Sequence, residues 1–153
     1  MTDKERKYKY SEIFLSAQGE GLGHTGRLTV WWRTFLCSLQ CLGFGQKDPT
    51  NPETYILPYQ TLDISSIKRI EDLPVFDYGC DSSYSWSAKY KHLQYEGTAK
   101  EIAQRLIDKL PHKQFVDPVT KAEIMWAVTG GKPLMARSQQ GFLEIMQEFK
   151  RLN

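Results

Sequence analysis

Long apolar runs are missing from this sequence of 153 residues. The longest, at residues 124–128, falls far short of the roughly 20 residues that a membrane-spanning helix needs, so no membrane segment is expected. Residues 1–10 are charged and lead into no apolar stretch, which argues against a secretory signal and for a cytoplasmic protein. A large charge excess is missing too, since the net charge is only +2, and nothing in it indicates direct nucleic-acid binding.

Cysteine is scarce, and the three in the chain, Cys37, Cys41 and Cys80, cannot all pair with one another. In a reducing compartment such cysteines more often bind metal or act in catalysis than form disulfides. Cys37 and Cys41 stand four positions apart directly after a predicted strand, so both thiolates can reach one metal centre. Three interpretations stay open: an iron–sulfur cluster with one open iron, a zinc site completed by a histidine, or three unrelated buried cysteines.

The composition is that of an ordinary globular protein, with 41% hydrophobic and 25% charged residues in a length that fits a single domain, residues 1–153. We expect residues 1–9 to form a flexible tail. Residues 42–79 show no helical period and contain four prolines, so they predict an irregular excursion. Strands are predicted at 10–16, 29–36 and 123–129 from alternation and from β-branched, aromatic or continuous apolar content. Helices are predicted at 98–111 and 138–150 from a capping box and from helical spacing of apolar residues.

This order of strands and helices predicts an α/β fold built from βα units around a parallel sheet. Ligands of such sheets bind at the carboxyl ends of the strands. The cysteine loop follows one predicted strand, and the pair Gly130-Gly131 follows another. We therefore expect these two elements to meet at one edge of the sheet.

Four stretches, in this order, resemble the radical S-adenosylmethionine (SAM) enzymes, and within them the 7-carboxy-7-deazaguanine synthase family. They are residues 10–21, which end in Gln18-Gly19-Glu20-Gly21, residues 26–33, the loop from Cys37 to Cys41, and Thr129-Gly130-Gly131-Lys132-Pro133. The resemblance implies a partial (β/α) barrel of the radical SAM type. It also implies a shortened one, because family members continue well beyond the last of these motifs.

The third cluster cysteine of the family is not in its usual place. The family pattern is Cys-x3-Cys-x2-Cys followed by Asp-Thr, whereas this chain has Phe44 at the third position and Cys80-Asp81-Ser82 further on. We interpret residues 42–79 as an insertion between the second and third ligands of a [4Fe–4S] cluster. Such loops cost little, since each doubling of length adds only about 0.6 kcal/mol of closure free energy. The other interpretation is that Phe44 marks a lost ligand and Cys80 is incidental.

The resemblance implies an enzyme that converts 6-carboxy-5,6,7,8-tetrahydropterin to 7-carboxy-7-deazaguanine, in the biosynthesis of queuosine and other 7-deazapurines. It implies the [4Fe–4S] cluster, SAM and Mg²⁺ as cofactors and a reductant such as flavodoxin as a partner. No catalytic residue is assigned beyond the cluster. The positions that match the family's site are Cys37, Cys41 and Cys80 for the cluster, Gly130, Gly131 and Lys132 for SAM, Ser82 for Mg²⁺, and Gln18, Glu20 and Arg33 for the substrate.

Lys132 is the main departure from the family, which has a glutamate there that helps to hold the SAM ammonium group. Lysine reverses the sign of the charge, so we expect weakened SAM binding. Leu28 and Ser38 are smaller departures, at positions where the family has proline and asparagine. Two alternative functions stay open: a glycyl-radical enzyme activase, and a degenerate, inactive iron–sulfur or zinc-binding protein. A sheet edge left open by missing strands favours a homodimer.

Overall fold

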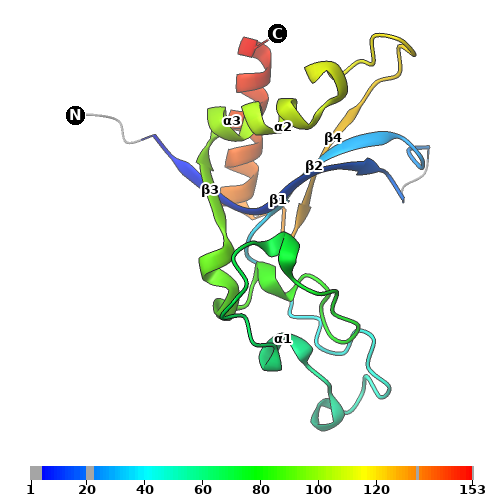
Figure 1. The fold of residues 1–153 in the computed structure, drawn as a ribbon, viewed down its shortest axis with the longest axis vertical. Coiled ribbons are helices and arrows are strands. Elements are labelled where there is room, and N and C mark those ends of the chain that lie inside the picture. Colours follow the sequence, from blue (N-terminus) through cyan, green and yellow to red (C-terminus); the bar gives the residue numbers. More distant parts are fainter. Residues whose placement is uncertain (1–4, 20–22, 134, 153) are drawn as a thin grey trace.

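The structure is a computed structural model that describes residues 5–19, 23–133 and 135–152. Its centre is a four-stranded sheet with helices on one side (Figure 1). The strands are β1 Lys7–Ala17, β2 Leu28–Thr34, β3 Tyr95–Thr98 and β4 Met125–Gly130. The α-helices are α1 Pro58–Thr61, α2 Ala99–Lys109 and α3 Ala136–Leu152, and short 3-10 helices cover Pro52–Thr54, Ile70–Asp72, Ser83–Ser85, Ala88–Leu93 and Pro111–Lys113. The expected α/β class is confirmed.

The sheet is mixed, so the expectation of a parallel sheet is wrong in part. The strand order is β3-β1-β2-β4, and β1 runs antiparallel to both β2 and β3. A short connection joins β1 to β2, and such a connection can only reverse the chain. β2 and β4 are parallel neighbours, because the long crossover between them carries α2.

Three strand expectations need correction. β1 begins at Lys7, and Tyr8 is 2% exposed, so residues 7–9 belong to the sheet and not to a tail. β3 was not predicted, because four residues are too few to show alternation. β4 was expected to be buried, but it is the outermost strand next to β2, and its residues are half-buried.

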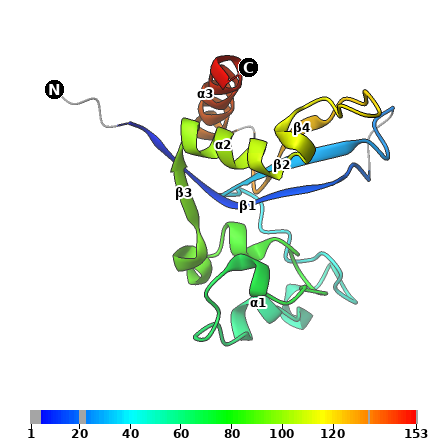
Figure 2. The same ribbon diagram turned by 45° about the horizontal axis from the view of Figure 1, so that its top comes forward.

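The main core lies between the sheet and the helices α2 and α3 (Figure 2). The expected capping box opens α2, since the Thr98 hydroxyl accepts from the Glu101 N–H while the Glu101 carboxylate accepts from the Thr98 N–H. On α3, Gly141 allows the close approach of two rings. A Cβ there would lie 2.8 Å from Tyr8 and 2.9 Å from Trp32. Trp32 is 1% exposed at the centre of this core.

Residues 36–94 form a lobe at the carboxyl ends of β2 and β4 (Figures 1 and 2). The irregular excursion expected at 42–79 contributes α1 and two 3-10 helices, with little other regular structure. It nevertheless packs together with the segment after it, in an aromatic cluster that includes Tyr59 and Phe76 of the excursion and Tyr84 and Tyr90 beyond it. Among the helices of the described residues, none combines the length and apolar character needed to cross a bilayer.

Candidate cluster and cofactor site

The carboxyl ends of β2 and β4 bring the cysteine loop and the glycine pair together. Thr34, the last residue of β2, is in register with Gly130, and the Gly131 N–H donates to the Thr34 carbonyl at 3.3 Å. Leu36, two residues after Thr34, donates its N–H to the Ser85 carbonyl of the lobe at 2.9 Å. The expectation that both motifs meet at one edge of the sheet is therefore confirmed.

The two glycines are required by the closeness of this contact. Gly130 has a φ of +103°, which side chains rarely adopt, and a Cβ there would lie 2.4 Å from the Thr34 carbonyl oxygen. A Cβ on Gly131 would lie 2.2 Å from the Leu36 carbonyl oxygen and 3.0 Å from the Cys37 Cβ. The glycine turn thus packs directly against the first cysteine of the loop.

The cysteine loop has an unusual backbone. Leu36 and Cys41 have φ values of +75° and +46°, in the left-handed region that costs non-glycine residues energy. All three cysteines are free thiols, with Cys37 and Cys80 half-buried and Cys41 exposed. The Cys37 Sγ accepts from the Leu39 N–H at 3.4 Å. Such outliers concentrate at functional sites, where the surrounding structure holds them.

The fold brings the residue before Cys80 next to Phe44. The Gly79 N–H donates to the Phe44 carbonyl at 2.7 Å, so the residue before Cys80 is bonded to the position of the family's third cysteine. The neighbouring Gly45 packs closely against Asp77, because a Cβ on Gly45 would lie 2.5 Å from the Asp77 carbonyl oxygen. The 38 residues between Cys41 and Cys80 are thus closed into a loop whose ends meet.

Electrostatics also place the thiols near one another. The pKa of the Cys41 thiol is raised, first by desolvation and then by the negative charge of Cys80, Cys37 and Asp81. A thiolate at Cys41 is therefore disfavoured, mainly by desolvation, unless a cation lies beside it. A metal cluster supplies such a cation, since metal binding deprotonates its cysteine ligands.

Within the described residues, no three His, Cys, Asp or Glu side chains are grouped so that they could hold one metal ion. Thiolates around tetrahedral zinc lie about 3.8 Å apart, given Zn–S bonds of about 2.3 Å. In a [4Fe–4S] cluster each cysteine binds a different iron, so the thiolates stand further apart. The three free cysteines, two half-buried and one exposed, are thiol donors of the kind that either centre uses.

Lys132 lies beside the cysteine loop. Its Nζ donates to the Ser38 hydroxyl at 2.9 Å, which joins the glycine turn to the residue after Cys37. The side chain is exposed, so its positive charge stays solvated. The residues expected in the SAM region are therefore all next to the cysteine loop.

Arg33 bonds to Tyr84, on the face of the sheet that α2 and α3 leave open. Arg33 Nη1 lies 3.0 Å from Glu12 Oε2 and also donates to the Tyr84 hydroxyl. Ser82, two residues before Tyr84, donates its Oγ to Asp81 Oδ1 at 2.9 Å. This polar chain runs from the segment after Cys80 to the middle of the sheet.

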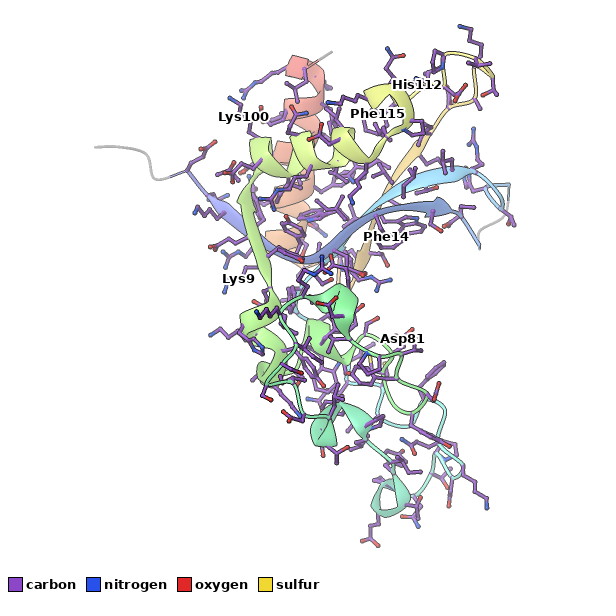
Figure 3. All side chains as sticks on the ribbon, viewed as in Figure 1. Lys9, Phe14, Asp81, Lys100, His112 and Phe115 are labelled. Carbon is purple, nitrogen blue, oxygen red and sulfur yellow. The ribbon has the colours of Figure 1, made fainter. Side chains whose placement is uncertain are left out.

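The environment of this chain is partly desolvated. Burial is the main cause that raises the pKa of Glu12, and the positive charge of Arg33 opposes it. Burial likewise raises the pKa of Tyr84. Arg33 and Glu12 side chains are 26% and 23% exposed, and the guanidinium lies 5.3 Å from the centre of the Phe14 ring. This row of polar side chains thus offers a guanidinium, a carboxylate and an aromatic face to a polar planar ligand. Figure 3 labels Phe14 on the sheet and Asp81 in the lobe.

Gln18 is not brought to this site. Its backbone pairs with Arg27 and Gly26 at the turn between β1 and β2, which is the opposite end of β2 from Cys37. The seven residues of β2 separate these ends by about 20 Å, at roughly 3.3 Å for each of the six steps from the first residue to the last. Glu20 lies outside the described residues. The structure therefore places the glycine turn beside Cys37 and Arg33 beside Tyr84 of the segment after Cys80, and it leaves Gln18 apart.

Two site residues escape the sequence interpretation. Glu12 lies in the motif that ends in the glycine-rich turn, but only the cross-strand register with Arg33 reveals its role. Tyr84 lies in a 3-10 helix two residues after Ser82, where no periodicity points inward or outward. Both become visible only when the strands and the lobe are assembled.

Comparison with known proteins gives no match: no family model, no curated protein and no solved structure is significantly similar to the chain. The resemblance to the radical SAM enzymes therefore depends on the four motifs and on the geometry described above.

Proposed function

We propose that this protein is a radical SAM enzyme similar to 7-carboxy-7-deazaguanine synthase. The observation that carries the proposal is the bond from the Gly79 N–H to the Phe44 carbonyl, which sets Cys80 beside the position of the missing third cysteine. Cys37, Cys41 and Cys80 would hold a [4Fe–4S] cluster, which supplies the electron for reductive cleavage of SAM when both are bound. The substrate would be 6-carboxy-5,6,7,8-tetrahydropterin and the product 7-carboxy-7-deazaguanine.

The residues of the chain have separate tasks in this proposal. Gly130 and Gly131 let the turn after β4 pack against Thr34 and Leu36, which sets this turn beside the cysteine loop where the SAM methionine would bind. Arg33 would bind the substrate carboxylate with its guanidinium, and Glu12 would hold that guanidinium in place. Ser82 and Asp81 present adjacent oxygen atoms of the kind that Mg²⁺ prefers.

The architecture is compatible with the start of a partial barrel. β2, α2 and β4 form one β-α-β unit with the site at the carboxyl ends of its strands. β4 is the last strand in the order, so within the described residues one of its edges has no strand beside it. We propose that a homodimer covers this edge, and that flavodoxin or a similar protein delivers electrons from the side of the lobe.

A degenerate cluster-binding protein is the second candidate, and the bond between Lys132 and Ser38 favours it. This bond holds the positive charge of Lys132 where the family has a glutamate for the SAM ammonium group. Such a protein would keep the cluster and lose SAM turnover.

The deciding experiment is anaerobic reconstitution with iron and sulfide, followed by iron analysis and EPR with and without SAM. About four irons per chain and a spectrum that changes on addition of SAM would support the enzyme, and pterin turnover would follow. A cluster whose spectrum ignores SAM would indicate the degenerate protein. Absence of a cluster after reconstitution would overturn both.

A further inference from the structure

A pocket of about 370 Å³ lies on the helix side of the sheet. It is bounded by β1 and β2, by the start of α3 and by the lobe segment that includes Ser85 and Lys91. Its volume is at the lower end of the range for small-molecule sites. The polar chain around Arg33 lies on the other face of the sheet, whereas Thr34 and Leu36 in the pocket wall also contact the glycine turn, so the pocket adjoins the candidate cluster site.

The walls of the pocket are aromatic, with a few polar atoms set among them. Trp32, Phe35 and Trp86 supply the aromatic surface. Ser85 is 1% exposed, and within the described residues its Oγ has no hydrogen-bond partner, as is also true of the Trp32 and Trp86 indole nitrogens. Buried polar atoms are normally hydrogen-bonded, and four of the seven such atoms without a partner in the described residues belong to this wall, the Tyr8 hydroxyl included, which points to a ligand that bonds to them.

The charge around the pocket has one sign. Lys9, Lys91 and Arg137 line it, and none of the described lining residues is acidic. Figure 3 shows Lys9 where the sheet meets the lobe. Arg137 lies in the first turn of α3, which has no acidic residue, although the positive end of a helix dipole disfavours a cation there. Its guanidinium uses one N–H for the Lys7 carbonyl, at 3.2 Å, and has others left for an anion.

We propose that this pocket binds a small planar aromatic molecule with one acidic group, such as an aryl carboxylate. The ring lies against Trp86, and the acidic group faces Arg137 and Lys91. The Ser85 hydroxyl and the indole N–H groups bond to polar atoms of the ligand. This binding does not depend on the cysteines, so it can be tested on metal-free protein.

The first test titrates 2-naphthoate into the full ¹⁵N-labelled chain and follows the indole N–H signals of the four tryptophans. The signals of Trp32 and Trp86 should move. Those of Trp31, on the opposite face, and Trp126, which packs on Phe142 at 4.6 Å, should stay in place. Equal movement of all four signals, or of none, would overturn the proposal.

The second test separates charge from apolar contact. The neutral isostere 2-naphthamide should bind roughly tenfold more weakly than 2-naphthoate, because it lacks the charged hydrogen-bond acceptor. Arg137→Gln should weaken naphthoate binding by about threefold to fivefold, as expected for a partly exposed ion pair. Arg151→Gln, near the far end of the same helix, is the matched control and should bind like the parent protein.

A third variant fills the pocket. Ala88 is an exposed lining residue, and Ala88→Trp should abolish naphthoate binding while the amide spectrum stays dispersed. Unchanged affinity in folded Ala88→Trp, or equal affinity in Arg137→Gln and Arg151→Gln, would contradict the proposed site. If Ala88→Trp does not fold, the comparison of the two arginine variants decides.

Discussion

The Nζ of Lys132 donates a hydrogen bond to the hydroxyl of Ser38 at 2.9 Å. This bond joins the turn after β4 to the loop after β2, and it sets a positive charge one residue from Cys37. The backbone of the same turn is pressed against that loop at Gly131, which keeps the base of the Lys132 side chain beside the cysteine loop. The charge at position 132 therefore acts on whatever binds beside the cysteines.

Replacement of Lys132 by glutamate should tighten SAM binding. Two positive charges about 4 Å apart cost on the order of 4 kcal/mol at an effective dielectric of 20. Because Lys132 is exposed, solvent reduces this cost, and we expect about a tenfold gain in affinity, or roughly 1.4 kcal/mol. Calorimetry of the reconstituted protein with SAM measures the difference.

Ser38→Ala is the control for this experiment. It removes the hydrogen-bond acceptor but keeps the lysine, so its SAM affinity should equal that of the parent protein. Equal affinities for Lys132→Glu and the parent would show that the charge does not reach the ligand.

Gly131→Ala should destabilise the contact between the two motifs. Its methyl group would lie 2.2 Å from the Leu36 carbonyl oxygen, which is backbone and cannot rotate away. Overpacking of this kind costs about 1–3 kcal/mol, to be measured by urea unfolding. Gly19→Ala, with nothing within 4 Å of its Cβ, should change stability far less. Equal unfolding midpoints for the two variants would contradict the close packing at Gly131.

The identity of the third ligand can be tested by exchange of two residues. Cys80→Ser should lower the iron content after reconstitution, because one thiolate is lost. The double variant Phe44→Cys/Cys80→Ser restores the spacing Cys-x3-Cys-x2-Cys and should recover much of the iron, since Phe44 is exposed and bonded to Gly79. Full iron content in Cys80→Ser alone would show that Cys80 is not a ligand.

Local patterns in the sequence predicted the elements with strong signals. The capping box at Thr98 placed the start of α2, and aromatic alternation placed β2. The mixed sheet was not predicted, because strand direction depends on pairing between distant segments. β3 was missed for the same reason, since its four residues are defined mainly by their bonds to β1.

The candidate site was predicted in part. That the cysteine loop and Gly130-Gly131 meet follows from parallel strands, and the sequence was enough to expect it. The approach of Cys80 to Phe44 and the link from Arg33 to Tyr84 were beyond prediction. Both depend on how residues 42–79 pack, and an irregular segment leaves no periodic trace of its contacts.

Thr98→Ala should reduce stability by about 1 kcal/mol, because the first turn of α2 loses its cap. Thr98→Ser keeps the hydroxyl that accepts from the Glu101 N–H, so it should stay close to the parent protein. Urea unfolding at constant pH compares the three proteins. A loss of the same size in Thr98→Ser would mean that burial of the threonine methyl, and not the cap, sets the cost.

The ion pair between Glu12 and Arg33 is expected not to stabilise the fold. Burial raises its folded pKa above the ordinary value of 4.5, despite Arg33 at 3.0 Å. The folded protein therefore holds this proton more tightly than the unfolded chain, and stability falls as the pH rises from about 4.5 through the folded pKa. Glu12→Gln does not titrate, so its stability relative to the parent should increase between pH 4 and pH 7 in urea unfolding. A relative stability that decreases over this range would show that Arg33 outweighs burial and holds the Glu12 pKa below its ordinary value.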